Sequence, residues 1–321
     1  MLTSELIKKE AKAQGADAVG IGSLDRYEGA PRQMDIRQMM PGAKSIVAMA
    51  FRHYRGLFRG IEEGTFFTAY SAMGYAGINY IYQPLVLWHV GKLLEDHGHD
   101  ALPVPNNFPW GNSDGSGRDP EKTAKYNPAR SNPVSPDKPA PDVFPHMRIA
   151  AYVAGLGEIG YSKMFLTPQF GPRQRLAFIL TTAELEPDPV IKPGTLCDKC
   201  MDCVKACTFG AIPKHKTVKV HVAGEDIEWA DIDMKRCGTG FCGGNSQHNP
   251  FAVTDHDKAE FAEDVGRAQR HKLEPVYMYS RALEGASGCV RACMIHLEEQ
   301  GKLENKFESK FRKKKPWKMP R

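Results

Sequence analysis

The stretch LCDKCMDCVKAC, from Leu196 to Cys207, contains four of the eight cysteines of the 321-residue chain at the spacing C-x2-C-x2-C-x3-C. In a two-cluster iron–sulfur fold, the first three thiolates of such a run bind one [4Fe-4S] cluster, and the fourth binds a second cluster. The spacing therefore predicts another group of cysteines elsewhere in the chain. A zinc site and a disulfide are the alternatives.

The second group is present as Cys237, Cys242 and the pair in GCVRAC, which repeats the C-x3-C spacing of the first group. Two zinc sites would give no reason for this repeated spacing. We therefore predict two [4Fe-4S] clusters that use all eight cysteines. The crossed ligand sets are Cys197, Cys200, Cys203 and Cys293 for one cluster, and Cys207, Cys237, Cys242 and Cys289 for the other.

The composition is that of a globular protein, with 41% hydrophobic and 25% charged residues. No run approaches the roughly 18 apolar residues of a membrane helix, so we expect no membrane association. The start of the chain, MLTSELIKKEAKAQG, predicts an amphipathic helix and lacks the features of a secretory signal. We therefore expect a cytoplasmic protein, in which thiols serve metal or redox chemistry rather than disulfides.

The net charge of +5 is concentrated near the C-terminus. From Lys302 to Arg321 the chain has nine Lys or Arg residues and two Glu residues. We predict a basic tail at 301–321. This tail is either a solvated terminus or a surface for RNA phosphates or an acidic electron-donor protein.

The first 186 residues alternate between helical and strand patterns, which predicts an α/β (α+β) core. A helical pattern with a break near Pro84 covers about 66–97. Short apolar runs bounded by turn residues predict strands. The predicted strands are 16–22, 45–51, 101–105 and 176–182.

Residues 106–145 are rich in Pro, Gly, Asn and Ser and have few apolar residues. Such a long connection is typical of a loop over a binding site or of a disordered insert. We divide the chain into a core at 1–186, which includes this long loop, and an iron–sulfur domain at 187–300.

Several motifs carry a resemblance to a known family. They are IKKEAKAQGADAVGIGSLD, PGAKSIVAMAFRHY, AYVAGLGEIGYSKMFLTPQFGPRQRL and the double cysteine pattern. With these motifs the chain resembles the superfamily of corrinoid and iron–sulfur reductive dehalogenases and epoxyqueuosine reductases. The first two motifs look like the start of the epoxyqueuosine reductases, whereas AGLGE, LTPQFGPR and LEPDP look more like the dehalogenases.

The resemblance implies a nitroreductase-like core that binds cobalamin in the base-off form, followed by a ferredoxin-like domain that reduces the cobalt. The chain contains no D-x-H-x-x-G motif for a histidine ligand below the cobalt. Glycines would allow the backbone to approach the corrinoid closely, although a tight turn below the sheet would also require them. The predicted corrinoid-binding residues are Asn106, Ala154, Gly155, Gly157, Gly160, Tyr161 and Gly171.

The chain departs from both groups at two positions. Pro141 occupies the place of an aspartate in the epoxyqueuosine reductases, with Asp142 adjacent to it, and Tyr161 occupies the place of an arginine that is common in the dehalogenases. The chain therefore sits between the two named activities, and a third activity is an alternative. We see no separate RNA-binding repeat after the iron–sulfur part, which argues against a tRNA substrate.

The separation typical of the dehalogenases places the proton donor at Tyr80. A core aromatic is the alternative role for this residue. Other tyrosines that could replace it are Tyr75, Tyr82, Tyr152 and Tyr161. Arg148 could stabilise a phenolate or bind an anionic substrate, or it could form a surface salt bridge.

The leading prediction is an oxidoreductase in which a ferredoxin or flavodoxin supplies electrons through two [4Fe-4S] clusters to cobalt, for the reduction of a small organic substrate. One alternative is an electron-transfer protein that reactivates the corrinoid of a partner. Another alternative is a flavin-dependent reductase.

Overall fold

A computed structural model describes residues 1–28, 35–106, 133–139, 141, 143, 145–241, 250–251 and 288–317. The greater part of the predicted 106–145 loop lies outside these residues, and so does Cys242. Within the described parts, no helix combines the length and the apolar character needed to cross a bilayer.

The core is a four-stranded sheet with the order β1-β2-β6-β3, in which every neighbouring pair is antiparallel. Residues of β2 alternate between its two faces, and both faces are buried. The four strands confirm the predicted ones within a few residues. Their bounds are β1 Ala18–Ser23, β2 Ser45–Arg52, β3 Ala101–Val104 and β6 Gln174–Thr181.

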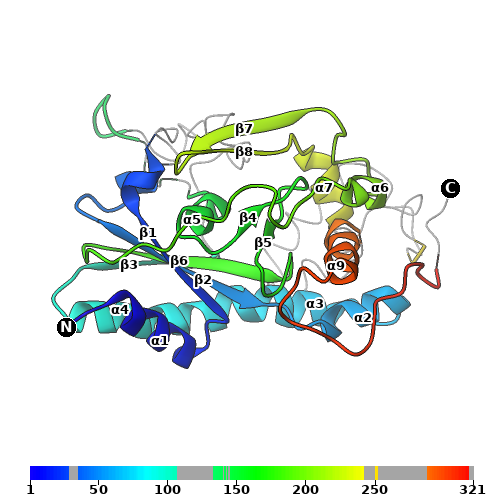
Figure 1. Ribbon diagram of the computed structural model, residues 1–321, viewed down its shortest axis with the longest axis horizontal. Coiled ribbons are helices and arrows are strands. Elements are labelled where there is room, and N and C mark those ends of the chain that lie inside the picture. Colours follow the sequence, from blue (N-terminus) through cyan, green and yellow to red (C-terminus); the bar gives the residue numbers. More distant parts are fainter. Residues whose placement is uncertain are drawn as a thin grey trace.

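Helices cover both faces of this sheet (Figure 1). Helices α1 (Ser4–Gln14) and α4 (Gln83–Asp96) pack on one face through residues such as Ile7 and Val90. Helix α5 (Met147–Val153) packs on the other face, where Ile149 joins the cluster that contains Phe178. Short 3-10 helices at η1 (Leu24–Tyr27) and η3 (Ile36–Gln38) connect β1 to β2.

A long helical segment runs from α3 (Thr68–Ser71) through η4 (Ala72–Tyr82) into α4. Pro84 lies in the first turn of α4, directly after η4, and has no N–H to donate to the preceding turn. The predicted break therefore appears as a change of helix type. Element η4 has the wide turns of a π-helix, which are frequent at functional sites.

Of the remaining elements, α2 (Gly56–Glu63) precedes α3, β4 and β5 lie between α5 and β6, and the others follow β6. Strands β4 and β5 pair with each other, and β7 and β8 form a hairpin that the sequence interpretation missed. The cysteines lie in and around three short helices. The bounds are β4 Glu158–Ile159, β5 Phe165–Leu166, β7 Thr217–Val222, β8 Glu225–Ala230, α6 Asp202–Ala206, α7 Met234–Phe241 and α9 Cys289–Glu299.

The basic residues near the C-terminus are not part of a fully solvated tail. In the described segment 301–317, Leu303 and Phe311 are buried. Glu62 of α2 accepts hydrogen bonds from the guanidinium of Arg291 at 2.7 Å and from the backbone N–H of Arg312 at 2.6 Å. The segment is therefore fixed between α2 and α9, while many of its lysines stay exposed.

Candidate functional site

The first cysteine group is assembled from two distant parts of the chain. Cys197 and Cys200 lie on the loop before α6, and Cys203 lies within α6. Lys199 and Met201 have positive φ angles, so this loop winds tightly around its thiols. Cys293 comes from α9, and all four cysteines line one cavity together with Tyr161 and Leu196. The cysteines that the spacing assigns to one cluster are thus neighbours in the fold.

Burial and neighbouring thiols raise the pKa values of Cys200, Cys203 and Cys293. Burial, followed by the proximity of Cys197 and Cys200, raises the pKa of Cys203 to about 11. Burial and the other three thiols also raise the pKa of Cys293 well above its ordinary value. A bound metal cluster reverses this preference, because its positive charge stabilises the thiolate form. The donor set therefore fits a metal cluster better than four free thiols.

Glu158, the glutamate of AGLGE, holds the loop that carries Cys197. Its buried carboxylate accepts hydrogen bonds from the N–H groups of Gly194 and Leu196, each at 2.8 Å, and from that of Cys197. Burial raises the pKa of Glu158, although these hydrogen bonds oppose the shift. The sequence interpretation gave Glu158 no role of its own. The feature of the sequence that could have indicated this role is a carboxylate inside a glycine-rich turn.

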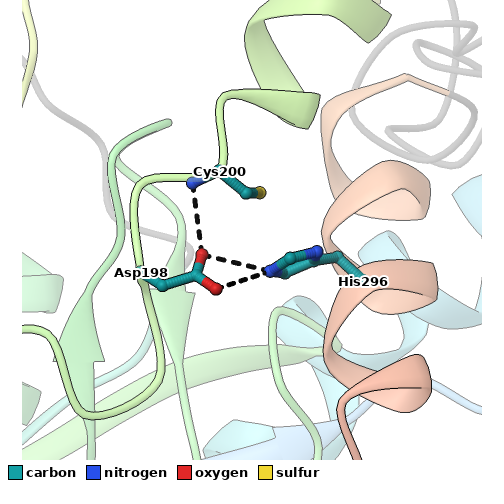
Figure 2. A group of neighbouring side chains, drawn as sticks. All are labelled: Asp198, Cys200 and His296. Carbon is teal, nitrogen blue, oxygen red and sulfur yellow. Dashed lines mark hydrogen bonds and ion pairs between the residues drawn. The ribbon is translucent and has the colours of Figure 1, made fainter.

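A second layer of polar residues surrounds Cys200 (Figure 2). The Asp198 carboxylate accepts hydrogen bonds from the Cys200 N–H at 3.1 Å and from Gln300 at 2.8 Å, and it lies 2.9 Å from His296 Nε2. Although burial opposes the shift, the hydrogen bonds from Gln300 and His296 lower the pKa of Asp198 to about 2. Asp198, Cys200 and His296 lie close enough to bind one ion. Because Cys200 belongs to the four-thiol set, we interpret the other two as residues that fix its loop.

Three residues of the second cysteine group are described, and Cys242 is not. Cys207, Cys237 and Cys289 all pack against the apolar cluster that contains Ile212 and Ile232. The Cys207 Sγ accepts a hydrogen bond from the Ala211 N–H at 3.3 Å. Cys289 lies one helical turn before Cys293 on α9, so this helix contributes one thiol to each group.

A separate cavity of about 200 Å³ opens beside β6 and η4. The guanidinium carbon of Arg175 lies 3.8 Å from the centre of the Tyr75 ring. Arg175 Nε also donates a hydrogen bond to Asn79 at 3.2 Å, which fixes the cation over the ring. The lining is Tyr75, Asn106, Pro145, His146, Met147, Arg148, Met164, Phe165, Pro172, Gln174, Arg175 and Leu176.

Two of the predicted site residues, Asn106 and Arg148, line this cavity, and so does Tyr75 among the alternative tyrosines. Tyr80 is 40% exposed and does not belong to the lining. Burial, followed by the proximity of Tyr75, raises the pKa of Tyr80, and Arg175 opposes the shift. The cavity therefore favours Tyr75 over Tyr80 as the residue that can meet a bound molecule.

Of the predicted glycines, those of the AGLGEIG motif make close contacts with other protein atoms. A Cβ atom at Gly157 would lie 2.0 Å from the Leu166 carbonyl oxygen, and one at Gly155 would lie 2.5 Å from that of Pro189. Gly155 also has a φ of +72°. The motif therefore matches the tight-turn alternative, in which glycine allows backbone segments to pack closely.

The other predicted corrinoid residues also lie away from the cavity lining. Gly160 and Tyr161 line the first cysteine cavity, and the Tyr161 hydroxyl donates to the carbonyl oxygens of Pro213 and Lys214. A Cβ atom at Gly171 would lie 3.1 Å from Leu297 of α9. Ala154 is fully buried in the core beside α5. A corrinoid contact at these four positions stays a prediction.

The second cysteine group and the cavity share a wall. The ring centres of Phe241 and Tyr75 are 5.7 Å apart. Phe241 packs in the same apolar cluster as Cys289 and Met164, and Met164 lines the cavity. Cys289 of the second group thus lies near this cavity, whereas the first group lines its own cavity beside α9.

Cysteine thiols grouped beside a polar cavity are typical of a redox protein that delivers electrons to a bound group. No protein-family model matches the chain. The chain is 37% identical over 129 residues to the tetrachloroethene reductive dehalogenase of Desulfitobacterium hafniense, a match over 36% of this chain and 23% of that protein. It is 29% identical over 132 residues to the tetrachloroethene reductive dehalogenase of Sulfurospirillum multivorans, over 36% and 26% of the two chains.

Solved structures with similar folds carry related names. A catabolic reductive dehalogenase aligns with 75% of this chain and 29% of its own, at a TM-score of 0.48 and 19% identity. An epoxyqueuosine reductase from Bacillus subtilis aligns over 93% and 82%, at a TM-score of 0.44 and 17% identity. The curated relatives carry a name from the superfamily that the sequence resembles, and proteins so named are oxidoreductases. The curated matches span only about a quarter of the relatives' length.

Proposed function

We propose that the chain is a corrinoid-dependent iron–sulfur reductase that passes electrons through two [4Fe-4S] clusters to reduce a small organic substrate. One observation carries the proposal. Cys293, about ninety residues away in sequence, lines the same cavity as Cys197, Cys200 and Cys203. The second group lies against the wall of the Tyr75 cavity, which supports an order of first cluster, second cluster and cavity.

The donor sets fit the proposed clusters. Cys197, Cys200, Cys203 and Cys293 would hold the first cluster, and the Tyr161 N–H donates to the Cys197 sulfur at 3.3 Å. Cys207, Cys237, Cys242 and Cys289 would hold the second. Hydrogen bonds to cluster sulfurs help to set reduction potential. Tyr161 and Ala211 would therefore tune the clusters through their backbone N–H groups.

The cavity of about 200 Å³ is smaller than a whole corrinoid, so its described lining would contact only one part of the macrocycle and its amide side chains. Asn106, Arg148 and Arg175 provide polar groups, and Met164 and Leu176 provide apolar surface. When bound there, a corrinoid supplies a cobalt ion that, once reduced, breaks a carbon–heteroatom bond. The absence of a D-x-H-x-x-G motif supports binding in the base-off form.

Tyr75 is the proposed proton donor. A tyrosine hydroxyl, with an ordinary pKa of about 10, is protonated at neutral pH. The Arg175 guanidinium 3.8 Å from the ring centre would stabilise the phenolate that forms when the proton leaves. Arg148 on the same lining would orient an anionic group of the substrate.

Metal analysis and cobalamin titration of anaerobically purified protein test this function. We expect about eight iron and eight acid-labile sulfide per chain. Added cobalamin should bind, and the EPR spectrum of its Co(II) form should show no nitrogen nucleus on the lower face. Two zinc ions without sulfide would refute the cluster assignment. A bound flavin, or clusters without any cobalamin binding, would favour the flavin-dependent or partner-reactivation alternatives.

A further inference from the structure

We propose that the C-terminal segment 302–317 is the docking surface for a small acidic electron-carrier protein that reduces the first cluster. This inference rests on the proposed electron-transfer function. In the docked complex the carrier would lose one electron and the cluster would gain it, so no bond is formed or broken and no proton moves.

The segment is strongly basic and presents its charge to solvent. It contains seven Lys or Arg residues and two Glu residues. Five of the seven basic side chains are exposed, and they lie within nine residues of one another: Lys306, Lys310, Arg312, Lys313 and Lys314. Two of these are matched by acids of the protein itself, since Arg312 pairs with Glu63 and Lys313 pairs with Glu299. The segment still carries an excess of positive charge.

Its packing gives the segment a fixed shape. The guanidinium carbon of Arg55 lies 4.6 Å from the Phe307 ring centre and 4.0 Å from that of Phe311. Arg55 also pairs with Glu298 of α9 at 2.8 Å, and the Trp317 indole donates to the Glu62 carbonyl oxygen at 3.2 Å. A basic surface held by such contacts loses little entropy when a partner binds.

The same segment begins directly at the first cysteine group. Lys302 Nζ donates a hydrogen bond to the carbonyl oxygen of Leu196, the residue before Cys197, at 3.1 Å. Leu303 packs in one apolar cluster with Leu196 and the half-buried Cys197 and Cys293. Lys306 and Lys310 line a groove with Glu298 of α9, which is about 8 Å along the helix axis from Cys293. A protein docked on these lysines would lie close to the first cluster.

The acidic residues around the first group have basic partners of their own. Asp202 pairs with Lys205 at 2.9 Å and Glu228 pairs with Lys199 at 2.5 Å, and the Asp198 carboxylate is hydrogen-bonded to His296 and Gln300. They therefore offset little of the positive field from the segment. An acidic surface is the complement that such a field attracts, and electrostatic steering suits the small, short-lived interfaces of electron-transfer partners.

The test compares two charge-reversal variants of the cluster-loaded protein. The docking variant changes Lys306→Glu, Lys310→Glu and Lys314→Glu. The control changes Lys9→Glu, Lys12→Glu and Lys92→Glu, which alters the net charge equally on α1 and α4, at the other end of the molecule (Figure 1). An acidic bacterial ferredoxin, photoreduced, serves as the donor, and stopped-flow absorbance follows cluster bleaching.

We expect the docking variant to be reduced by the ferredoxin at least about 10-fold more slowly than the control at low ionic strength. The difference should vanish near 1 M salt, where the screening length falls to about 3 Å. Dithionite should reduce both variants equally. A milder variant with Lys→Gln at the same three positions should show a smaller decrease with unchanged iron content, which excludes misfolding as the cause.

Equal ferredoxin rates in the docking and control variants, with normal dithionite reduction, would overturn the docking surface and leave the proposed function intact. Protein without iron and sulfide would overturn both. If the docking variant lost tRNA binding in a gel-shift assay while its ferredoxin rate matched the control, the basic segment would instead be an RNA surface, and the proposal would be wrong.

Discussion

Replacing Cys293 by serine should disturb the cluster whose other ligands lie about ninety residues earlier in the chain. Cys293 lines one cavity with Cys197, Cys200 and Cys203. Each of the four thiolates holds one iron of a [4Fe-4S] cluster, so Cys293→Ser leaves one iron without its sulfur ligand. The expected loss is roughly one iron per chain if the rest of the cluster survives, and roughly four of eight if it does not.

Iron and sulfide analysis together with EPR of the reduced protein measures this effect. Ala292→Ser is the matched control, because it adds a hydroxyl to the same helix one residue away and should leave both clusters intact. Cys207→Ser should alter the other EPR signal. If Cys293→Ser and Cys207→Ser changed the same signal, the crossed ligand assignment would be refuted.

Three further predictions concern the cavity and the packing around α2. Tyr75→Phe should lower turnover by about 10²–10⁴-fold and leave cobalamin binding unchanged, whereas Tyr80→Phe should have little effect on turnover. Steady-state assays measure both variants, and the opposite ranking would restore Tyr80 as the proton donor. Glu62→Gln should lower the free energy of unfolding by about 3–5 kcal/mol, because two arginines then contact a neutral side chain. Denaturant titration measures this change, and it should show a much smaller effect for Glu63→Gln, since Glu63 is half-exposed. Burial, followed by the charge of Arg175, lowers the pKa of His53 from 6.5 to about 3, so the unfolded chain binds a proton in this window that the folded chain does not. Stability should therefore fall as the pH falls from about 6.5 towards 3, and His53→Gln should make the decline shallower; an unchanged slope would contradict this.

Much of the core could be predicted because its signals are local. The apolar run at Ser45–Arg52 forms a central strand that is buried on both faces. An unbroken apolar run predicts such a strand without knowledge of the strands that pair with it. The hairpin β7–β8 was missed although Val218, Val220 and Val222 alternate with polar residues, a pattern typical of a half-buried strand. The pattern was present in the sequence, but our interpretation of this region considered only its cysteines.

The site was harder to predict, because it depends on which face of a helix meets the cavity. A family separation counted back to Tyr80 locates the helix but not the residue that meets the cavity. Tyr75 and Tyr80 are five residues apart within η4, whose π-helical turns close between residues five apart, so they lie about one turn from each other. Nothing in the local sequence predicts these wide turns. The role that we propose for Tyr75 rests on its place in the cavity lining and on its contact with Arg175 from β6, about a hundred residues later.

The packing of the basic segment could not be predicted from the sequence, because it depends on ion pairs between residues far apart in the chain. In the sequence Glu62 is one of two adjacent acids, yet in the fold it is fully buried between Arg59 and Arg291. Helix α9 then carries Cys289, Arg291, Cys293 and Glu298 within three turns. A single helix therefore links both cysteine groups to the surface where we propose that the donor docks. The ion pairs at Glu62 and Glu298 hold α9 in place, so a displacement of this helix should change cluster ligation and donor docking together.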